Sequence, residues 1–127
     1  NILESSSLVM KVMKITCDDV IELVKNTPFT TRYYSEIRYN EDTVARFWIN
    51  ERENTMMLHK ISDGFKVGQD LKGNYEVVPN KNCKRIQLID YEGFVNYLND
   101  MLCSLKVAKM NLKKELIETD FKKEGKL

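Results

Sequence analysis

The stretch YEGFVNYLNDMLCSLKVAKMNLKKELIETDFKK, residues 91–123, decides the fold of this chain. Its main apolar residues recur at intervals of three and four, at Phe94, Leu98, Met101, Leu105, Ala108, Leu112 and Leu116. That spacing places them along one side of an α-helix. The apolar stripe is wide as far as Ala108 and narrows to a single line beyond it. We therefore predict one long helix whose first half packs on a sheet and whose second half pairs with another helix.

The second half of this helix is expected to extend beyond the sheet. The whole helix of 33 residues would measure about 50 Å at 1.5 Å per residue, which exceeds the width of a sheet of five or six strands. The residues predicted to form a self-association surface are Leu105, Ala108, Leu112 and Leu116. A second copy of the chain is the simplest cover, because most homo-oligomers use a closed two-fold interface. The alternative is a helix that breaks near Asn111 and folds back.

Length and composition are typical of one folded domain. The chain has 127 residues, of which 43% are hydrophobic and 31% charged, which suits a protein with a core and not a disordered segment. Residues 1–12 are expected to be a leader or a non-native extension, and residues 13–127 a single α+β domain with a frayed C-terminal tail. The formal net charge of +1 gives no general attraction to nucleic acid or to an anionic membrane. No apolar run approaches the length of a membrane span.

The cysteines and the single histidine do not indicate catalysis or metal binding. Cys17, Cys83 and Cys103 are odd in number and widely spaced, which favours reduced thiols in a cytoplasmic protein. No C-x-x-C pair or Cys/His cluster has the spacing of a zinc site. His59 lies among apolar residues of a predicted strand, which is more typical of a half-buried residue than of a catalytic base. We predict no enzyme activity, no metal site and no cofactor.

Ahead of the long helix, the hydrophobic period changes from helical to extended. Residues 10–15 suit an edge strand or a lead-in. Thr16 can cap a short helix that ends at Asn26, with Asp19 at the capping-box position. Strands are predicted at residues 29–39, 44–49, 55–61, 65–67, 75–78 and 84–89. The predicted fold is α+β, with a short N-terminal helix, an antiparallel meander of about five or six strands, and the long C-terminal helix packed on the sheet.

The sequence also predicts how the strands are paired. With Tyr39 opposite Thr43, the core-face pairs of the first hairpin are Ile37–Ala45 and Tyr33–Ile49, and the outer-face pairs are Glu36–Arg46 and Tyr34–Trp48. An opposite-charge pair and an aromatic pair in one register support that register. The last strand is expected to point Ile86 and Leu88 inward. Asp90 is predicted to cap the long helix, and Gly93 in its first turn indicates a close approach of backbone.

A row of basic and aromatic residues is one candidate binding surface. Its members are Arg32, Tyr34, Arg38, Arg46, Trp48, Lys60 and Arg85. Guanidinium groups suit phosphate and aromatic rings suit stacking on a base, so the row could hold a small nucleotide-like anion. The alternative is a wet sheet face with ordinary cross-strand charge pairs. Nucleic acid itself is disfavoured by the near-neutral charge.

The same face is also a candidate protein interface. The expected apolar strip consists of Tyr34, Val44, Trp48, Met56 and Leu58. Aromatic residues, methionine and arginine are enriched at protein interfaces. The alternative is that the N-terminal helix of the same chain covers this strip.

Because the sequence shows no catalytic residues, the chain is expected to act by binding to a partner. We predict a non-enzymatic, stoichiometric binding protein, an inhibitor or regulator of a larger protein machine, that works as a homodimer. Its partners would be a second copy of itself and an unidentified protein. The alternative is a binder that sequesters a nucleotide-like anion at the sheet face or at the subunit interface. The small size of the chain suggests a phage or mobile-element origin.

Overall fold

The structure is a computed structural model that describes residues 15–81 and 85–125, with side chains described as far as Phe121. The elements in these residues are α2 (Cys17–Lys25), β1 (Thr30–Arg32), β2 (Glu36–Tyr39), β3 (Asp42–Asn50), β4 (Thr55–Lys60), β5 (Phe65–Gln69), β6 (Tyr75–Pro79), β7 (Arg85–Ile89) and α3 (Tyr91–Gly125). The predicted leader (1–12) and Cys83 lie outside the described residues, as does the predicted lead-in (10–15) apart from its last residue.

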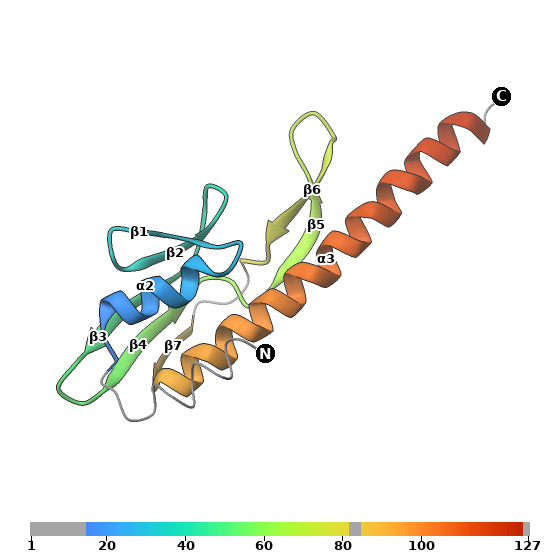
Figure 1. Cartoon of the computed structure of the whole chain (residues 1–127). Helices are drawn as coiled ribbons and strands as arrows, with labels where there is room; N and C mark the ends of the chain where they lie inside the picture. Colours follow the sequence, from blue (N-terminus) through green and yellow to red (C-terminus); the bar gives the residue numbers. More distant parts are fainter. Residues whose placement is uncertain (1–14, 82–84, 126–127) are drawn as a thin grey trace.

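The described strands form two antiparallel groups. Five of them make a sheet in the order β1-β2-β3-β4-β7, while β5 and β6 form a separate hairpin. The short helix α2 precedes the strands, and the long helix α3 packs on the sheet and then runs beyond it (Figure 1). The predicted α+β fold is therefore confirmed. The difference is that β5 and β6 leave the sheet and lie against α3.

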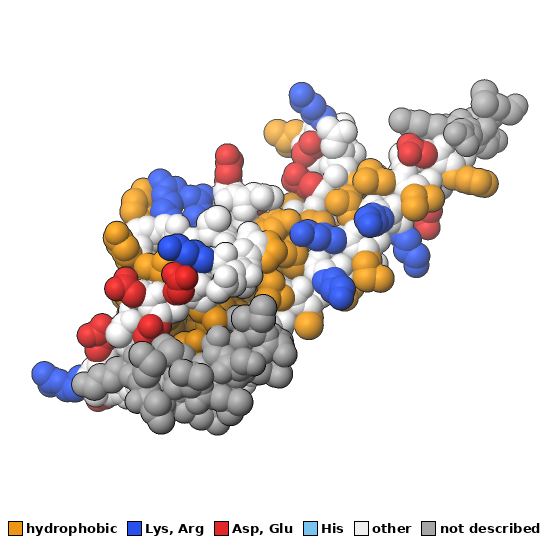
Figure 2. All heavy atoms as spheres, in the orientation of Figure 1, with side chains coloured by type: hydrophobic (Ala, Val, Ile, Leu, Met, Phe, Trp, Pro, Cys, Tyr) orange, Lys and Arg blue, Asp and Glu red, His pale blue; other side chains and the backbone are white. Residues whose placement is uncertain are grey.

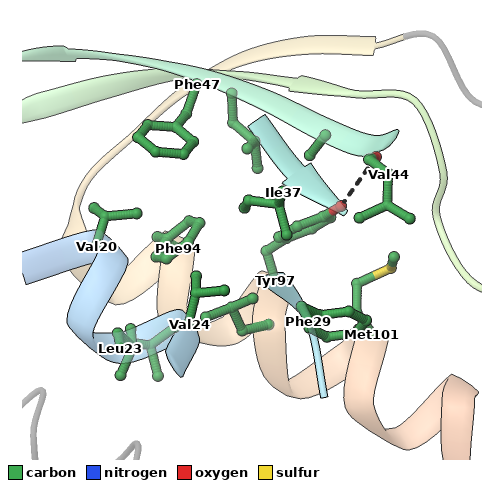
Figure 3. Close-up of a cluster of buried hydrophobic side chains, with 14 of the residues drawn as sticks. Val20, Leu23, Val24, Phe29, Ile37, Val44, Phe47, Phe94, Tyr97 and Met101 are labelled. Carbon is green, nitrogen blue, oxygen red and sulfur yellow. Dashed lines mark hydrogen bonds between the residues drawn. The ribbon is translucent and has the colours of Figure 1, made fainter. Parts of the chain in front are cut away.

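Both helices pack on one face of the five-stranded sheet, which we call the inner face (Figure 3). The buried sheet residues on this face are Ile37, Ala45, Phe47, Met56 and Leu58. They meet Val20, Leu23 and Val24 of α2 and Phe94, Leu98 and Met101 of α3. The sheet and the two helices therefore share one hydrophobic core.

Helix α2 begins where the sequence predicts. The backbone N–H of Asp19 donates a hydrogen bond to Thr16 Oγ1 at 3.2 Å, which confirms the predicted cap. Asp18 and Asp19 lie in the first turn and Lys25 in the last, and these charges favour the helix dipole.

The segment predicted as one strand, residues 29–39, is a hairpin instead. β1 and β2 pair with Arg32 opposite Glu36, and the chain turns between them at Tyr33 and Tyr34. These two tyrosines have φ values of 57° and 58°. Consecutive positive φ values are typical of type I′ turns, which favour Asn and Gly. Because two tyrosines give no such signal, the turn was missed, and the predicted pairs Tyr33–Ile49 and Tyr34–Trp48 are wrong.

The register between β2 and β3 is partly as predicted. The confirmed pairs are Ile37–Ala45 and Glu36–Arg46. A β-bulge then places Thr43 opposite Arg38 and not opposite Tyr39. At the bulge, Val44 is buried beside the next residue of β3. This extra residue accounts for the shift from the predicted register.

The inward orientation predicted for Ile86 and Leu88 is wrong. β7 pairs with β4 so that Ile86 lies opposite His59 and Leu88 opposite Met57. Directly paired residues share a face of the sheet, and Met57 points away from the core. Ile86 and Leu88 are accordingly 58% and 63% exposed, while Ile89 packs against the core. The alternation of β7 is therefore one residue out of phase with the prediction.

Helix α3 runs without interruption from Tyr91 to Gly125, so the break considered near Asn111 does not occur. The N–H of Gly93 donates to Asp90 Oδ1 at 2.8 Å, which confirms the predicted cap. A Cβ atom on Gly93 would lie 3.1 Å from Ile89 Cβ. The glycine therefore leaves room for the side chains of Ile89 and Asp90, and the neighbours at this point are not the backbone that the sequence predicted.

The β5–β6 hairpin lies beside the middle of α3 (Figure 1). The backbone N–H of Phe65 donates to Ser104 Oγ at 2.8 Å, which ties the start of β5 to the helix. At Gly64 a Cβ atom would lie only 2.7 Å from the same Oγ. Leu105 and Ala108 are each 2% exposed. The hairpin therefore extends the core along α3 past the edge of the sheet.

Candidate functional site

The row of basic and aromatic residues predicted as a binding surface is divided between the two faces of the sheet. Arg46 and Trp48 lie on the outer face, opposite the helices. Lys60 and Arg85 pair with each other on the inner-face side. The Lys60 Nζ lies 5.5 Å from the centre of the Tyr97 ring of α3. The structure therefore does not bring these charges together around one ligand.

Three arginines of the row, Arg32, Arg38 and Arg46, are engaged by neighbouring residues of the same hairpin. The partners are Glu36 for Arg46, the Tyr33 ring for Arg32, and the backbone carbonyl of Glu41 for Arg38. Arg46 Nε lies 3.2 Å from Glu36 Oε1, in the cross-strand pair that the sequence offered as the alternative to a ligand site. The Arg32 guanidinium lies 4.5 Å from the centre of the Tyr33 ring and donates to its hydroxyl at 2.6 Å. These contacts do not favour the anion-binding alternative.

Two open grooves mark the ends of the β1–β2 region. One, of about 330 Å³, is lined by Cys17, Tyr34, Ser35, Phe47, Trp48, Ile49 and Glu51. The other is lined by Val24, Lys25 and residues 27–31. Neither lining includes an arginine, so neither groove combines guanidinium and aromatic groups.

The Cys17 thiol in the first groove is not activated. Its Sγ donates to the Tyr34 carbonyl at 3.1 Å. Burial is the main cause that raises the pKa of Cys17, and the charges of Asp18 and Glu51 raise it further. The thiol is therefore protonated at neutral pH, whereas nucleophilic cysteines are thiolates.

The outer face carries a row of exposed apolar side chains. Trp48 lies opposite Met57, and Met57 lies opposite Leu88, so the three cross β3, β4 and β7 side by side. Ile86 occupies the same face of β7. Their exposed fractions are 50% for Trp48, 40% for Met57, 58% for Ile86 and 63% for Leu88. We call these four residues the outer patch.

The outer patch differs from the apolar strip predicted on this face. Val44, Met56 and Leu58 were placed in the strip, and this is wrong because each is at most 1% exposed in the core. Only Trp48 is common to both sets, since Tyr34 lies in the β1–β2 turn. The predicted alternative, cover by the N-terminal helix, fits Val44, Met56 and Leu58, which lie in the core that α2 shares (Figure 3). It does not fit Trp48, which lies on the opposite face of the sheet and is half exposed.

The predicted self-association residues of α3 differ in how far their own chain covers them. Leu105 and Ala108 are buried, Leu112 is half-buried, and Leu116 is 46% exposed. Figure 2 shows further hydrophobic side chains along the part of α3 that projects beyond the rest of the molecule. Along the predicted line of residues, cover by the same chain therefore ends only after Ala108, farther along the helix than the sequence predicts.

Comparisons with known proteins leave the function to be argued from these surfaces. No family model matches the chain, and neither the curated proteins nor the solved structures give a significant match. Neither α2 nor α3, the helices in the described part of the chain, combines the length and apolar character needed to cross a membrane. Among residues 15–81 and 85–125, no three His, Cys, Asp or Glu side chains are grouped to hold a metal ion.

Proposed function

We propose that this protein is a non-enzymatic, stoichiometric binding protein of the cytoplasm that inhibits or regulates a larger protein assembly. It works as a homo-oligomer and docks on its target through the outer patch. The observation that supports this proposal is that the apolar side chains of Trp48, Met57 and Leu88 lie next to one another and are exposed to solvent. Single exposed apolar residues are ordinary, whereas adjoining ones mark interaction sites. Tryptophan and methionine are also enriched at protein interfaces.

The outer patch extends to the edge of the sheet. β7 pairs with β4 on one side, and within the described residues no strand pairs with its other edge. An edge strand offers N–H and C=O groups to which a strand of another protein can add. Ile86 and Leu88 lie on this edge strand and would contact alternate side chains of the added strand. The partner we propose is therefore a protein that presents an extended apolar segment.

A pair of leucine-to-lysine variants tests this proposal. Leu88→Lys places a charge in the outer patch, while Leu71→Lys places the same charge on a fully exposed residue of the β5–β6 turn. Tagged wild type and Leu71→Lys should capture the same protein from the native host in a fixed stoichiometry. Capture by Leu88→Lys should fall at least about tenfold, because an unpaired charge is costly in an apolar interface.

The result that would overturn the proposal is capture by Leu88→Lys at the wild-type level, or no protein captured in fixed stoichiometry by the wild type. A photo-crosslinking residue at position 57 should form an adduct with the captured protein, and one at position 71 should not. Both leucines are exposed, so both variants should melt at the wild-type temperature. That control separates lost docking from lost folding.

A further inference from the structure

A second apolar stripe runs along α3 on the side away from the body. Its members are Cys103, Val107, Met110, Lys114, Ile117 and Phe121, which follow one another in alternating steps of four and three. This is the heptad spacing of a coiled coil, with Lys114 as its one polar member. We call these six residues the helix stripe.

The helix stripe is distinct from the stripe by which α3 packs on its own chain. Met110 follows the buried Leu105 by five residues, which turns it about 140° around the helix. The helix stripe is correspondingly open, with Val107 at 56%, Met110 at 62%, Ile117 at 67% and Phe121 at 74% exposed. A projecting helix without tertiary contacts is only marginally stable in water. Packing of this surface against a partner helix would stabilise it.

We propose that two copies of the chain pair through the helix stripe as an antiparallel two-stranded coiled coil. The stripe is symmetric about Leu112, so reversing one copy superposes the stripe on itself. The resulting layers pair Cys103 with Phe121, Val107 with Ile117 and Met110 with Lys114 of the second copy. In each chain the body packs on the first half of α3 (Figure 1). The antiparallel pair would therefore place the two bodies at opposite ends.

Lys114 decides between the two directions of pairing, because each direction forms flanking pairs of opposite charge, Lys106–Asp120 in the antiparallel one and Lys113–Glu118 in the parallel one. The antiparallel arrangement places Lys106 beside the oppositely charged Asp120 of the second copy, twice by symmetry. It also brings the two copies of Lys113 together, but at the solvent-exposed flank of the interface. The parallel arrangement places Lys114 against Lys114 inside the interface. Like charges that are removed from water repel far more strongly than exposed ones. The antiparallel direction is therefore the favoured one.

This inference rests on the homo-oligomer that forms part of the proposed function, and it does not depend on docking by the outer patch. It moves the predicted contact from Leu112 and Leu116 to the opposite side of α3. Failure of the dimer would leave the capture experiment with Leu88→Lys unaffected, so the two proposals fail separately.

Sedimentation of the full chain over about 1 to 100 µM, the range in which a weak interface associates, tests the pairing. Wild type should sediment as a dimer of the 14.9 kDa chain. Ile117→Asp should weaken the dimer at least about tenfold, because it puts a carboxylate into an apolar layer. Lys109→Asp, an exposed change outside the helix stripe, should leave the dimer intact. A monomeric wild type overturns the proposal, and so does a dimer that Leu112→Asp disrupts while Ile117→Asp does not.

Oxidation tests the direction of pairing through the native Cys103. In the antiparallel dimer the two copies of Cys103 lie about 27 Å apart, because 18 residues at 1.5 Å each separate their layers. They are therefore too far apart for a disulfide. The variant Phe121→Cys should form a disulfide between position 121 of one copy and Cys103 of the other, identified by peptide mapping. A Cys103–Cys103 disulfide in the wild type would overturn the antiparallel direction.

Discussion

The two halves of α3 share one helical periodicity and differ in what covers them. The first half, residues 91–108, supplies eight buried residues to the core, Tyr91, Phe94, Val95, Tyr97, Leu98, Met101, Leu105 and Ala108. In the second half, Leu116, Ile117 and Phe121 are between 46% and 74% exposed. The pattern of the sequence therefore determines that the helix forms, while the sheet, α2 and the β5–β6 hairpin determine which of its apolar residues become core.

The largest expected effect on stability is the difference between a leucine-to-alanine substitution in the first half of α3 and one in the second half. Leu98→Ala removes a side chain that is 0% exposed and should lower the free energy of unfolding by about 2–5 kcal/mol, because it leaves a cavity among close-packed neighbours. Leu116→Ala, at a site 46% exposed, should change it by less than about 1 kcal/mol. Urea unfolding with an unchanged slope measures both. Equal losses for the two variants would contradict the contrast between the halves.

An intermediate effect is expected where the first half of α3 meets the start of the β5–β6 hairpin. A Cβ atom at Gly64 would lie 2.7 Å from Ser104 Oγ, so Gly64→Ala should lower the free energy of unfolding by about 1–3 kcal/mol. Ser104→Ala alone removes the hydrogen bond to the Phe65 N–H and should also destabilise. In the double variant the crowding is relieved, so its loss should be smaller than the sum of the single losses.

A matched change elsewhere sharpens this test. Gly73→Ala meets no atom within 4 Å, and its φ of +84° makes the substitution strained for a different reason. Its effect should therefore add to that of Ser104→Ala. Additive losses for Gly64→Ala and Ser104→Ala would show that the two residues do not press on each other.

Features that depend on neighbouring residues could be predicted from the sequence. The stripe of α3 and the Thr16 and Asp90 caps follow from spacings of a few residues, and the structure has each of them. The pair Glu36–Arg46 also follows from a short hairpin. Local physics therefore accounts for the helices and for part of one hairpin.

Features that depend on the position of a strand within the sheet could not be predicted in the same way. Tyr33 and Tyr34 adopt a turn that bulky side chains seldom adopt, so no residue there indicated it. Ile86 and Leu88 alternate with Arg85 and Gln87, a pattern that favours the buried face for the two apolar residues. Pairing with β4 sets the opposite phase, which the sequence of β7 alone does not reveal. The outer patch was missed for this reason. The helix stripe was missed because the buried stripe alone explained the helix.

The smallest expected effect concerns the tip of the β5–β6 hairpin, which covers only the middle of α3. Asp70 Oδ1 accepts hydrogen bonds from the backbone N–H groups of Asn74 and Lys72, each at 2.9 Å. The bond from Asn74 is the main cause that lowers the pKa of Asp70. Because the folded pKa lies below the unfolded one, the stabilisation is complete above the unfolded pKa and is lost as the pH falls through the folded pKa.

Titration of Asp70 by NMR in the native and the urea-unfolded protein measures this difference. The native midpoint should be the lower of the two, and the hairpin amides should lose hydrogen-exchange protection at acid pH before those of the first half of α3. Asp70→Asn should remove the acid-dependent part of that loss. Equal midpoints in the two states would contradict the prediction. Because the carboxylate is exposed at a turn, its titration should leave the buried half of α3 intact, which separates local cover of the helix from the core that holds it.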